Sequence, residues 1–439
     1  MKRFYIETFG CQMNVHDSEK IAGTLMALGY SQAGNPAEAD LVLYNTCSIR
    51  DKAEQKVYSR LQQFKREANG KVYGVLGCVA QQEGLRIFDR APHVSLVCGS
   101  ASYAKLPQLM SELEKGNRRV TGLSLATDET FETPYTRRDD RHRAYMTIME
   151  GCDKECAYCV VPFTRGKERS RPRQSILEEA RRLVGSGWTE IQLLGQNVSS
   201  YRDSSSEDHG FASLLVEMAA IPGLERLRFM TSHPRDFDRA IVQAIESSPV
   251  LCDHVHLPVQ SGSTRVLERM RRQYTRDEYR RRIQWLKEAR RQIAITTDVI
   301  VGFPGETEAD FEETLRLVEE VRFDSMFSFK YSARPNTSAL ELDGHVPEDE
   351  KGRRLAILQE SQRAIQIRRN GELVGSVQEA AVEGYNHATG QWIGRTSQNR
   401  ILNFTHAAQA GAPLEGRYMR VRVTRAGPNS LAGESVDLV

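Results

Sequence analysis

Three cysteines lie close together in the segment GCDKECAYC, at positions 152, 156 and 159. A cube-shaped iron-sulfur cluster presents its iron atoms a few ångströms apart, so three thiolates on one short loop can each ligate a different iron. The fourth iron is then left open to another ligand. A tetrahedral zinc site would need a matching Cys or His pair, and the neighbouring sequence contains none. The spacing favours an iron-sulfur cluster held by Cys152, Cys156 and Cys159, with zinc or a chance grouping of thiols as the alternative.

A second set of cysteines follows three predicted strands of the first 118 residues: Cys11 in TFGCQMN, Cys47 in YNTCSIR and Cys78 in VLGCVA. Open parallel sheets bind ligands outside the carboxyl ends of their strands, so we expect these thiolates to converge. Cys98 ends a further strand and could supply a fourth ligand, although a buried apolar cysteine is the commoner case. Cys252 precedes a strand and is expected in the core.

Polar residues also follow the predicted strands of the central part of the chain. In β/α barrels the active site lies at that end of the strands, directly after which the GCDKECAYC loop also falls. Each motif alone can equally shape a turn or cap a strand. Their shared position predicts one polar mouth, formed by Gln196, Asn197, Ser232, His233, Gln260, Ser261, Asp298 and Arg334.

The predicted elements that position these residues form an α/β protein. Residues 1–118 alternate short apolar runs with helical patterns, which predicts a parallel α/β domain. A charged segment, 119–142, is predicted as a linker. Residues 143–370 contain six β/α units, a partial TIM-type (β/α)6 barrel closed by a charged helix near 348–370. Residues 371–439 change to short strands with turns between them, typical of a small all-β barrel.

Composition places few limits on function. The chain has 439 residues, enough for two or three domains, and a formal net charge of +2, so a polyanion would have to meet a local patch. No apolar run approaches the about 20 residues that span a bilayer, and the first residues contain no stretch of signal-peptide length. We therefore expect a cytoplasmic protein with no membrane partner, in which the eight cysteines do not form disulfides and thiolates are available for metal binding or redox chemistry.

The motif CxxxCxYC after a first barrel strand resembles that of the radical S-adenosylmethionine (SAM) superfamily. The resemblance implies that the open iron binds SAM, whose reductive cleavage gives a 5′-deoxyadenosyl radical for a C–H bond that is not acidic. It makes the central barrel a radical SAM core and leaves the catalytic residues, including any general base, unassigned. The implied cofactor-binding residues are Tyr158, Gln196, Asn197, Ser232, Gln260, Ser261 and Asp298.

The whole chain further resembles the methylthiotransferases, in which cysteines matching Cys11, Cys47 and Cys78 hold an auxiliary 4Fe-4S cluster connected with the inserted sulfur. The segments CQMNVHDSE, NTCSIRDKAEQK and GCDKECAYCVVPFTRGKERSR are most similar to the branch that modifies isopentenylated adenosine next to the anticodon of tRNA. The resemblance implies two 4Fe-4S clusters and a methylthio group added at position 2 of the adenine ring. In the family's mechanism one SAM methylates sulfur at the auxiliary cluster, and a second SAM is cleaved at the other cluster.

The resemblance also implies partners. These are the tRNA anticodon stem-loop, an electron donor such as flavodoxin or ferredoxin, and a sulfur source. The last 69 residues resemble the RNA-binding TRAM domain, and arginines interleaved with aromatic residues there suit phosphate contact and base stacking. The arginines are Arg395, Arg400, Arg417, Arg420, Arg422 and Arg425, and the aromatic residues are Trp392, Phe404 and Tyr418.

Two alternatives remain at this stage. The same chemistry could act on a ribosomal protein or on another modified tRNA adenosine. A non-enzymatic RNA-binding protein with structural iron-sulfur or zinc sites is the alternative from another class. One position departs from the family pattern, because Asn336 stands where the family usually has glycine; asparagine tolerates left-handed backbone geometry, so we expect the turn to survive.

Overall fold

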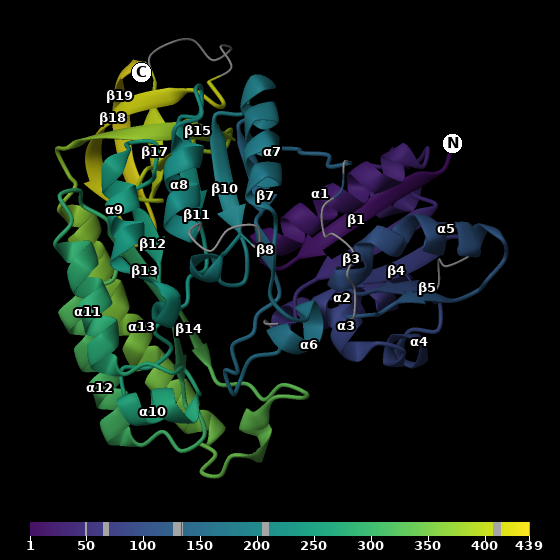
Figure 1. Ribbon diagram of the computed structural model, residues 1–439, viewed down its shortest axis with the longest axis horizontal. Coiled ribbons are helices and arrows are strands. Elements are labelled where there is room, and N and C mark those ends of the chain that lie inside the picture. The colour runs from purple at the N-terminus through teal and green to yellow at the C-terminus, as the bar shows by residue number, and fades with distance from the viewer. Residues whose placement is uncertain are drawn as a thin grey trace.

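The computed structural model describes residues 1–48, 51–64, 70–125, 133, 135–203, 210–406 and 414–438. Three sheet-based units follow one another along the chain (Figure 1): a parallel sheet at the N-terminus, a larger set of parallel strands, and a small closed barrel at the C-terminus. The predicted mixed α/β fold class is confirmed.

The N-terminal unit is a six-stranded sheet in the order β2-β1-β3-β4-β5-β6, with every neighbouring pair parallel. Its elements are β1 (Arg3–Phe9), α1 (Gln12–Ala27), β2 (Ser31–Gln32), β3 (Leu41–Thr46), α2 (Asp51–Phe64), β4 (Val72–Gly77), α3 (Cys78–Glu83), α4 (Arg86–Arg90), β5 (Val94–Cys98), α5 (Leu106–Glu114) and β6 (Val120–Gly122).

Helices cover both faces of this sheet. Apolar residues of α1 and α5 form one core with the sheet, and those of α2 and α4 form a second core on the other face. Strands β3 and β4 are buried almost throughout, as expected for central strands with both faces covered. The sheet also takes up Val120 to Gly122 from the segment predicted as a linker, because Val120 is buried against α5. Residues 126–132 and 134 of that segment lie outside the described residues.

The central unit alternates parallel strands with helices. Its elements are β7 (Arg143–Thr147), β8 (Met149–Glu150), α6 (Val161–Arg165), β9 (Arg169–Ser170), α7 (Arg173–Gly185), β10 (Glu190–Leu194), α8 (Phe211–Ala219), β11 (Arg226–Phe229), α9 (Arg239–Ser247), β12 (His254–His256), α10 (Thr264–Arg269), α11 (Arg276–Lys287), β13 (Ala294–Val301), α12 (Glu308–Val321), β14 (Ser325–Lys330) and α13 (Glu348–Gly371).

Its six long strands form two three-stranded parallel sheets, β7-β10-β11 and β12-β13-β14. A parallel bridge between Leu227 and Leu251 joins them, so the strands follow one another in chain order around a common core. Helices α7, α8, α9, α11 and α12 lie on the outside (Figure 1). All six strands therefore carry their carboxyl ends to one side, as a partial barrel requires.

The C-terminal unit is a closed barrel in the order β15-β16-β17-β19-β18. Its strands are β15 (Val377–Asn386), β16 (Gln391–Thr396), β17 (Ile401–Thr405), β18 (Tyr418–Ala426) and β19 (Leu431–Leu438). The barrel sits against the β11 edge of the central unit, where the buried guanidinium of Arg226 donates to Arg395 O at 2.6 Å and that of Arg228 to Thr396 O at 2.7 Å. The two units thus share a polar, buried interface.

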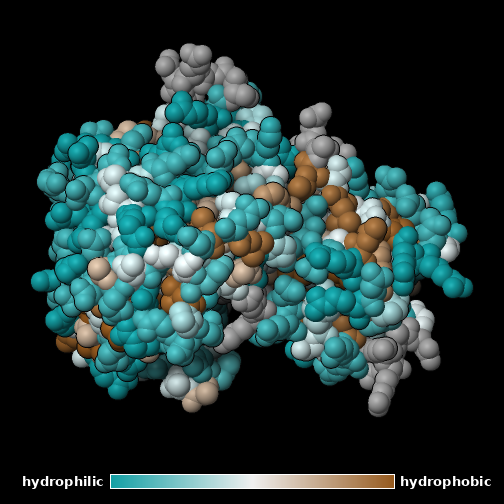
Figure 2. Space-filling model, turned by 90° about the horizontal axis from the view of Figure 1, so that it is seen from below, coloured by the Kyte–Doolittle hydropathy of each residue, from teal (hydrophilic) through white to brown (hydrophobic). Residues whose placement is uncertain are grey.

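None of the described helices is long and apolar enough to cross a membrane. On the face seen in Figure 2, hydrophilic residues dominate over the central unit, and apolar patches gather near the middle and over the N-terminal unit.

Candidate functional site

Cys152, Cys156 and Cys159 lie on the loop between β8 and α6, and all three line one cavity of about 550 Å³. The loop that follows β14, with Asn336, forms the opposite wall of this cavity. Asn336 has φ 65°, so the left-handed turn expected there is present. The sequence prediction that these three thiols share one site agrees with this geometry.

The position of the cysteine loop is fixed at its start. Gly151 has φ 78°, and a Cβ there would lie 2.0 Å from the Lys167 carbonyl oxygen, so only glycine fits. The Gly151 amide donates to Oε1 of Gln196 at 2.7 Å. Gln196, predicted as a cofactor contact, therefore ties the end of β10 to the cysteine loop.

The thiols of this loop lie beside a buried positive charge. Nη1 of Arg272 donates to Sγ of Cys156 at 3.3 Å, and Nε2 of His233 lies 4.0 Å from the same sulfur. Burial raises the pKa of Cys152 to about 11 and that of Cys159 to about 12, whereas burial, with the charge of Arg272, lowers the pKa of His233 to about 2. The imidazole is thus neutral, and the guanidinium supplies the positive charge near Cys156.

Arg272 was not anticipated from the sequence. It stands in the run RMRRQY, which has the composition of a solvated helix end, and the side chain is nevertheless only 5% exposed. Its Nη2 donates to the Pro258 carbonyl and its Nε to the Tyr274 hydroxyl, which hold the guanidinium under the cysteine loop.

Three predicted cofactor residues carry buried polar atoms that find no hydrogen-bond partner within the described residues: Ser232 Oγ, Gln260 Oε1 and Asp298 Oδ1. Asp298 Oδ1 lies 3.4 Å from His256 Nε2 without forming a hydrogen bond. Buried polar atoms in proteins are normally satisfied, so unpaired ones at the carboxyl ends of neighbouring strands suit a polar ligand. This donor and acceptor set fits SAM.

Two further predicted cofactor contacts, Asn197 and Ser261, form hydrogen bonds within the protein. Asn197 accepts from the His233 amide at 2.8 Å and donates to Asp236 at 2.6 Å, so it organises the loop after β11. The Ser261 hydroxyl accepts from the Ser263 amide at 3.2 Å and lies 3.4 Å from Thr314 Oγ1 of α12. Ser261 therefore faces away from the mouth in this structure, because its strand end turns toward α12.

Tyr158 belongs to the cysteine loop and packs against a group of aromatic side chains. Its ring meets Phe303 edge to face at 6.3 Å between centroids, and Phe303 meets Tyr331 at 5.2 Å. Burial raises the pKa of Tyr158 well above its usual range. The tyrosine therefore stays neutral and forms part of the apolar wall beside Cys156 and Cys159.

The second cysteine set lies at the carboxyl ends of three adjacent strands, β1, β3 and β4. Phe9 pairs with Thr46 and Thr46 with Gly77, so the residues that follow these positions come together at one sheet edge. The Cys47 amide donates to Phe9 O at 2.9 Å, and a Cβ at Gly10 would lie 2.7 Å from Cys47 Cβ. Cys11, Cys47 and Cys78 are thus brought together as predicted from the strand ends.

The electrostatics of this set differ from those of the loop. A hydrogen bond with Cys47 lowers the pKa of Cys11 to about 6, against burial and with help from Arg165. Burial raises the pKa of Cys78, and Arg165 again opposes the shift. Thiolate character at Cys11 is what metal ligation needs.

The two remaining cysteines are both buried, Cys98 in an apolar core and Cys252 beside the charged side chains of Arg228 and Glu190. Cys98 is fully buried, packs with Leu96 and Leu109, and directs its Sγ to the carbonyl oxygens of Gly99 and Ser102 at 3.6 Å. Burial raises its pKa to about 12. This geometry gives Cys98 a structural role. Cys252 is buried as well, as expected.

Within the described part of the chain, no three His, Cys, Asp or Glu side chains gather closely enough to hold a single metal ion. A 4Fe-4S cluster has a different requirement, because each thiolate binds its own iron atom and the sulfur atoms need not share one point. Each set offers three thiols and no carboxylate or imidazole group in a tetrahedral arrangement. The donor chemistry of both sets therefore fits an iron-sulfur cluster better than zinc.

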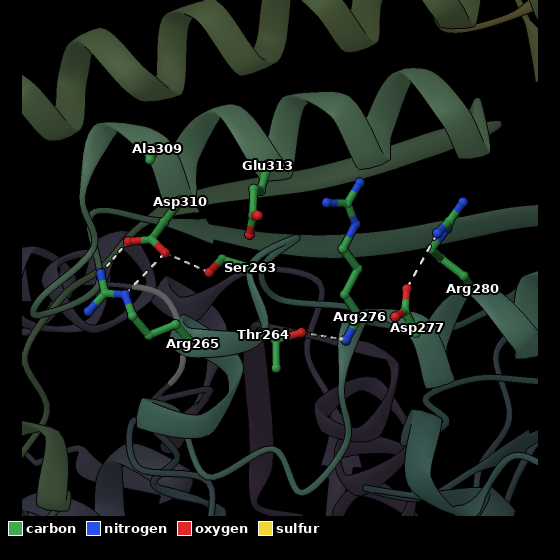
Figure 3. Close-up of a pocket in the computed structure, with 9 residues that line it drawn as sticks. All are labelled: Ser263, Thr264, Arg265, Arg276, Asp277, Arg280, Ala309, Asp310 and Glu313. Atoms are coloured by element: carbon green, nitrogen blue, oxygen red, sulfur yellow. Dashed lines mark hydrogen bonds and ion pairs between the residues drawn. The ribbon is translucent and has the colours of Figure 1, made fainter.

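A second cavity, of about 540 Å³, opens between the N-terminal ends of α10, α11 and α12 (Figure 3). Two ion pairs join charged residues of its lining: Arg265 with Asp310, and Arg280 with Asp277. No cysteine is among its lining residues. It is separate from both cysteine sets.

The arginines of the C-terminal barrel are of two kinds, some in ion pairs and others exposed to solvent. Arg395 pairs with Glu383 at 2.6 Å, and Arg400 pairs with Asp324 of the central unit, so these two residues have structural partners. Arg417, Arg420, Arg422 and Arg425 are exposed. Arg395 and Arg400 thus have a structural role, and their contact with phosphate stays a prediction.

The three aromatic residues of the predicted pattern differ in exposure. Phe404 is fully buried, Trp392 packs against the barrel core, and Tyr418 lies 4.7 Å from the Arg226 guanidinium at the interface with the central unit. The most exposed part of the predicted RNA-binding pattern is therefore the arginines of and beside β18, whereas Phe404 is removed from it.

Three family models match the chain in succession. The model described as "Uncharacterized protein family UPF0004" matches residues 3–99, that of the "Radical SAM superfamily" residues 146–318, and that of the "TRAM domain" residues 371–436. Each match falls on one of the three structural units.

Curated relatives cover the whole chain. A protein of Solibacter usitatus named tRNA-2-methylthio-N(6)-dimethylallyladenosine synthase is 66% identical over 100% of this chain and 99% of its own length. A protein of the same name from Koribacter versatilis is 59% identical over 99% of this chain and 98% of its own length. Among solved structures, the radical S-adenosylmethionine methyltransferase TsrM from Kitasatospora setae has a TM-score of 0.56 at 14% identity, covering 86% of this chain and 77% of that chain, which supports the fold.

Proposed function

The chain belongs to the family of tRNA-2-methylthio-N(6)-dimethylallyladenosine synthases, and we propose that it adds a methylthio group to position 2 of the adenine ring of isopentenylated adenosine in tRNA. It is a radical SAM methylthiotransferase. The structural observation that supports this function is the presence of two separate three-thiol sets, one at the edge of the N-terminal sheet and one at the mouth of the central barrel.

Cys152, Cys156 and Cys159 are proposed to hold the 4Fe-4S cluster that the radical SAM family implies, and Cys11, Cys47 and Cys78 a second, auxiliary one. When bound, the first cluster with SAM supplies radical chemistry for a C–H bond that no side-chain base could deprotonate. The auxiliary site would hold the sulfur to be inserted.

The protein's own residues orient and enclose this chemistry. Gly151 and Gln196 fix the cysteine loop, and the buried Arg272 guanidinium stabilises negative charge on Cys156. The unpaired atoms of Ser232, Gln260 and Asp298 are positioned to bind the polar groups of SAM. Tyr158, the neighbour of Cys159, packs on Phe303, which packs on Tyr331, so this aromatic group supports the cysteine loop.

The tRNA substrate is consistent with the family and with the C-terminal barrel. We propose that the anticodon stem-loop is the part bound, with exposed Arg420 and Arg422 of β18 contacting phosphate. Reductive cleavage also requires an electron donor, such as flavodoxin or ferredoxin, and sulfur insertion requires a sulfur source. Because tRNA is the substrate and all eight cysteines are free thiols, we propose that the enzyme works in the cytoplasm.

The test is an assay of anaerobically reconstituted, full-length enzyme with SAM, a chemical reductant and tRNA that carries isopentenylated adenosine. Nucleoside mass spectrometry is expected to detect the 2-methylthio derivative, and tRNA without the isopentenyl group serves as the matched control. Cleavage of SAM without methylthiolated nucleoside, combined with modification of a ribosomal protein in the same assay, would assign the chemistry to a different substrate.

A further inference from the structure

The side chain of Arg165 crosses from the central unit into the N-terminal unit. Arg165 ends α6, six residues after Cys159, and is 3% exposed. Its Nη2 donates to Oδ2 of Asp17 at 2.5 Å. Asp17 lies on α1, six residues after Cys11, and is 1% exposed. One buried ion pair therefore joins the helices that follow the two cysteine sets.

Arg165 has further contacts on both sides. Its Nη1 lies 3.4 Å from Oε1 of Glu150, two residues before Cys152. Its positive charge also acts on the Cys78 thiol, where it opposes the rise in pKa that burial causes. A single guanidinium thus interacts with the loop of one proposed cluster and with a proposed ligand of the other.

The backbone around Arg165 is held in place independently of its side chain. The hydroxyl of Ser100, just after β5, donates to the Thr164 carbonyl at 3.0 Å. Helix α6 lies next to α3, the helix that Cys78 begins (Figure 1). The guanidinium is therefore directed to the auxiliary site by the packing of the two units.

The charges around Arg165 indicate how this residue can influence a cluster bound nearby. Asp17 and Glu150 are both buried, and Arg165 with the partly exposed Arg169 balances them. Thiolates bound to a cluster add negative charge, and the charge and hydrogen bonds around cluster ligands set its reduction potential. Arg165 lies on α6, which packs against the helix that Cys78 begins, and is paired with Asp17 across the boundary.

We propose that Arg165 is a positioning residue for methylthiolation: it holds the radical-cluster loop against the auxiliary site and places a fixed positive charge beside Cys78. This inference rests on the proposed auxiliary cluster at Cys11, Cys47 and Cys78. The arrangement couples the two centres, so loss of Arg165 separates SAM cleavage from sulfur insertion.

The first test isolates the auxiliary cluster in full-length protein by replacing Cys152, Cys156 and Cys159 with alanine. Reconstituted variants in this background are titrated electrochemically and followed by electron paramagnetic resonance. Arg165→Gln removes a positive charge and is expected to lower the midpoint potential, whereas Asp17→Asn removes a negative charge and is expected to raise it. Shifts of opposite sign distinguish a charge effect from a general loosening of the interface.

The second test measures coupling in the chain with all its cysteines, as methylthiolated nucleoside formed per 5′-deoxyadenosine. Arg165→Gln is expected to lower this ratio about tenfold or more, the usual effect of removing a residue that supports metal ligands, while SAM cleavage persists. Arg165→Lys keeps the charge without the planar fork, so it is expected to keep the potential but lose much of the coupling. Arg169→Gln, which loses a partner of the same Glu150, is the matched control and is expected to retain coupling.

Unchanged potentials in Arg165→Gln and Asp17→Asn, or shifts of the same sign, would overturn the proposal, as would unchanged coupling in Arg165→Gln. If Arg165→Gln fails to hold iron, the Arg165→Lys and Asp17→Asn variants decide by the same criteria. An iron content unaffected by alanine at Cys11, Cys47 and Cys78 would instead contradict the auxiliary cluster itself.

Discussion

Both proposed clusters have one buried guanidinium beside their thiols. Arg272 donates a hydrogen bond to Cys156, and both residues belong to the central unit. Arg165 also belongs to the central unit, but its charge acts on the thiol of Cys78 in the N-terminal unit. Arginine stays charged even when buried, so each site keeps a fixed positive neighbour at any working pH. Arg272 lies 116 residues after Cys156 in the sequence, so no local pattern indicates their contact.

Substitution of the two cysteine sets is expected to abolish different activities. Alanine at Cys152, Cys156 and Cys159 should remove about four iron atoms and all SAM cleavage, because the site that binds SAM is lost. Alanine at the three cysteines of the N-terminal sheet should remove a similar amount of iron but leave cleavage intact while sulfur insertion stops. Iron counting and 5′-deoxyadenosine assays check this, with Cys252→Ala as the control. Retained cleavage in the first variant would contradict the assignment.

Glu19 gives a prediction on pH. Burial raises the pKa of its carboxyl group to about 8, against the charge of Arg138 and with help from Asp139 and Asp140. An unfolded glutamate has a pKa of about 4.3, so between these values the folded state binds the extra proton and stability falls as pH rises. In Glu19→Gln this dependence is absent. His16, its hydrogen-bond partner at 2.8 Å, is present in both proteins.

The stability of Glu19→Gln relative to the parent should therefore increase from pH 5 to pH 8, by at most about 1.4 kcal/mol per pH unit. Thermal unfolding at several pH values measures the difference. The exposed Glu225→Gln serves as the control and should show a constant offset. A difference that is constant for Glu19→Gln as well would show that the carboxyl group is ionised throughout this range.

At the scale of elements, parallel strands account for most of what the sequence could predict. A cysteine or polar residue at a strand end must lie at one edge of its sheet, whatever the strand order, so the grouping of Cys11, Cys47 and Cys78 followed from position alone. The direction in which a side chain at a turn points could not be predicted from its position in the sequence. Ser261 and Gln260 are neighbours, yet one bonds to α12 and the other keeps an unpaired oxygen at the mouth.

Long-range ion pairs were beyond sequence reasoning. The sequence predicts a phosphate contact for Arg400 because arginines and aromatic residues are interleaved there, but its ion-pair partner Asp324 lies 76 residues earlier. A local pattern contains no information about such a partner. The same applies to Phe404, whose place in the barrel core depends on closure of all five strands.

The N-terminal ends of α10 and α12 form one hydrogen-bonded unit, seen in Figure 3 around Asp310. Its carboxylate accepts from the Thr307 amide at 2.8 Å and from the Ser263 hydroxyl at 2.6 Å, and Ser263 is the residue that caps α10. Although burial opposes it, hydrogen bonds from Arg265, Ser263 and Thr307 hold the pKa of this carboxyl group well below its usual range. One side chain therefore stabilises two helix ends.

Asp310→Ala should accordingly destabilise both helix ends, by about 2–3 kcal/mol in local opening, compared with about 1 kcal/mol for Glu278→Ala, which disrupts a capping box in α11 alone. Native-state hydrogen exchange of the first amides of α10 and α12 measures this directly, since a protein with several domains need not unfold in two states. Equal effects of the two substitutions would mean that Ser263 caps α10 without help from Asp310.

At the scale of the whole molecule, the C-terminal barrel is fixed to the central unit and does not hang from a linker. Arg226 and Arg228 donate to its backbone carbonyls, and Asn370 Nδ2 donates to Gly427 O at 2.7 Å. Removing residues after 370 would leave both buried guanidinium groups without these partners, which is costly. Deletion of the barrel would therefore disturb the radical domain and cannot test RNA binding alone.

Substitution of exposed arginines tests the RNA-binding surface without this damage. Arg420 and Arg422 point outward from β18, between the carboxylate-bearing strands β15 and β19, and make no ion pair among the described residues. If both contact phosphate, the change of both to glutamine should weaken binding of the anticodon stem-loop and reduce the slope of log affinity against log salt by about 2, because each lost contact releases about one counterion fewer. Binding measured at several salt concentrations gives the slope.

The double variant Arg281→Gln/Arg316→Gln removes the same charge from helices on the outside of the central unit and should change the slope much less. Equal slopes for the two double variants would place the phosphate contacts elsewhere, at the barrel mouth or along the boundary with the N-terminal unit.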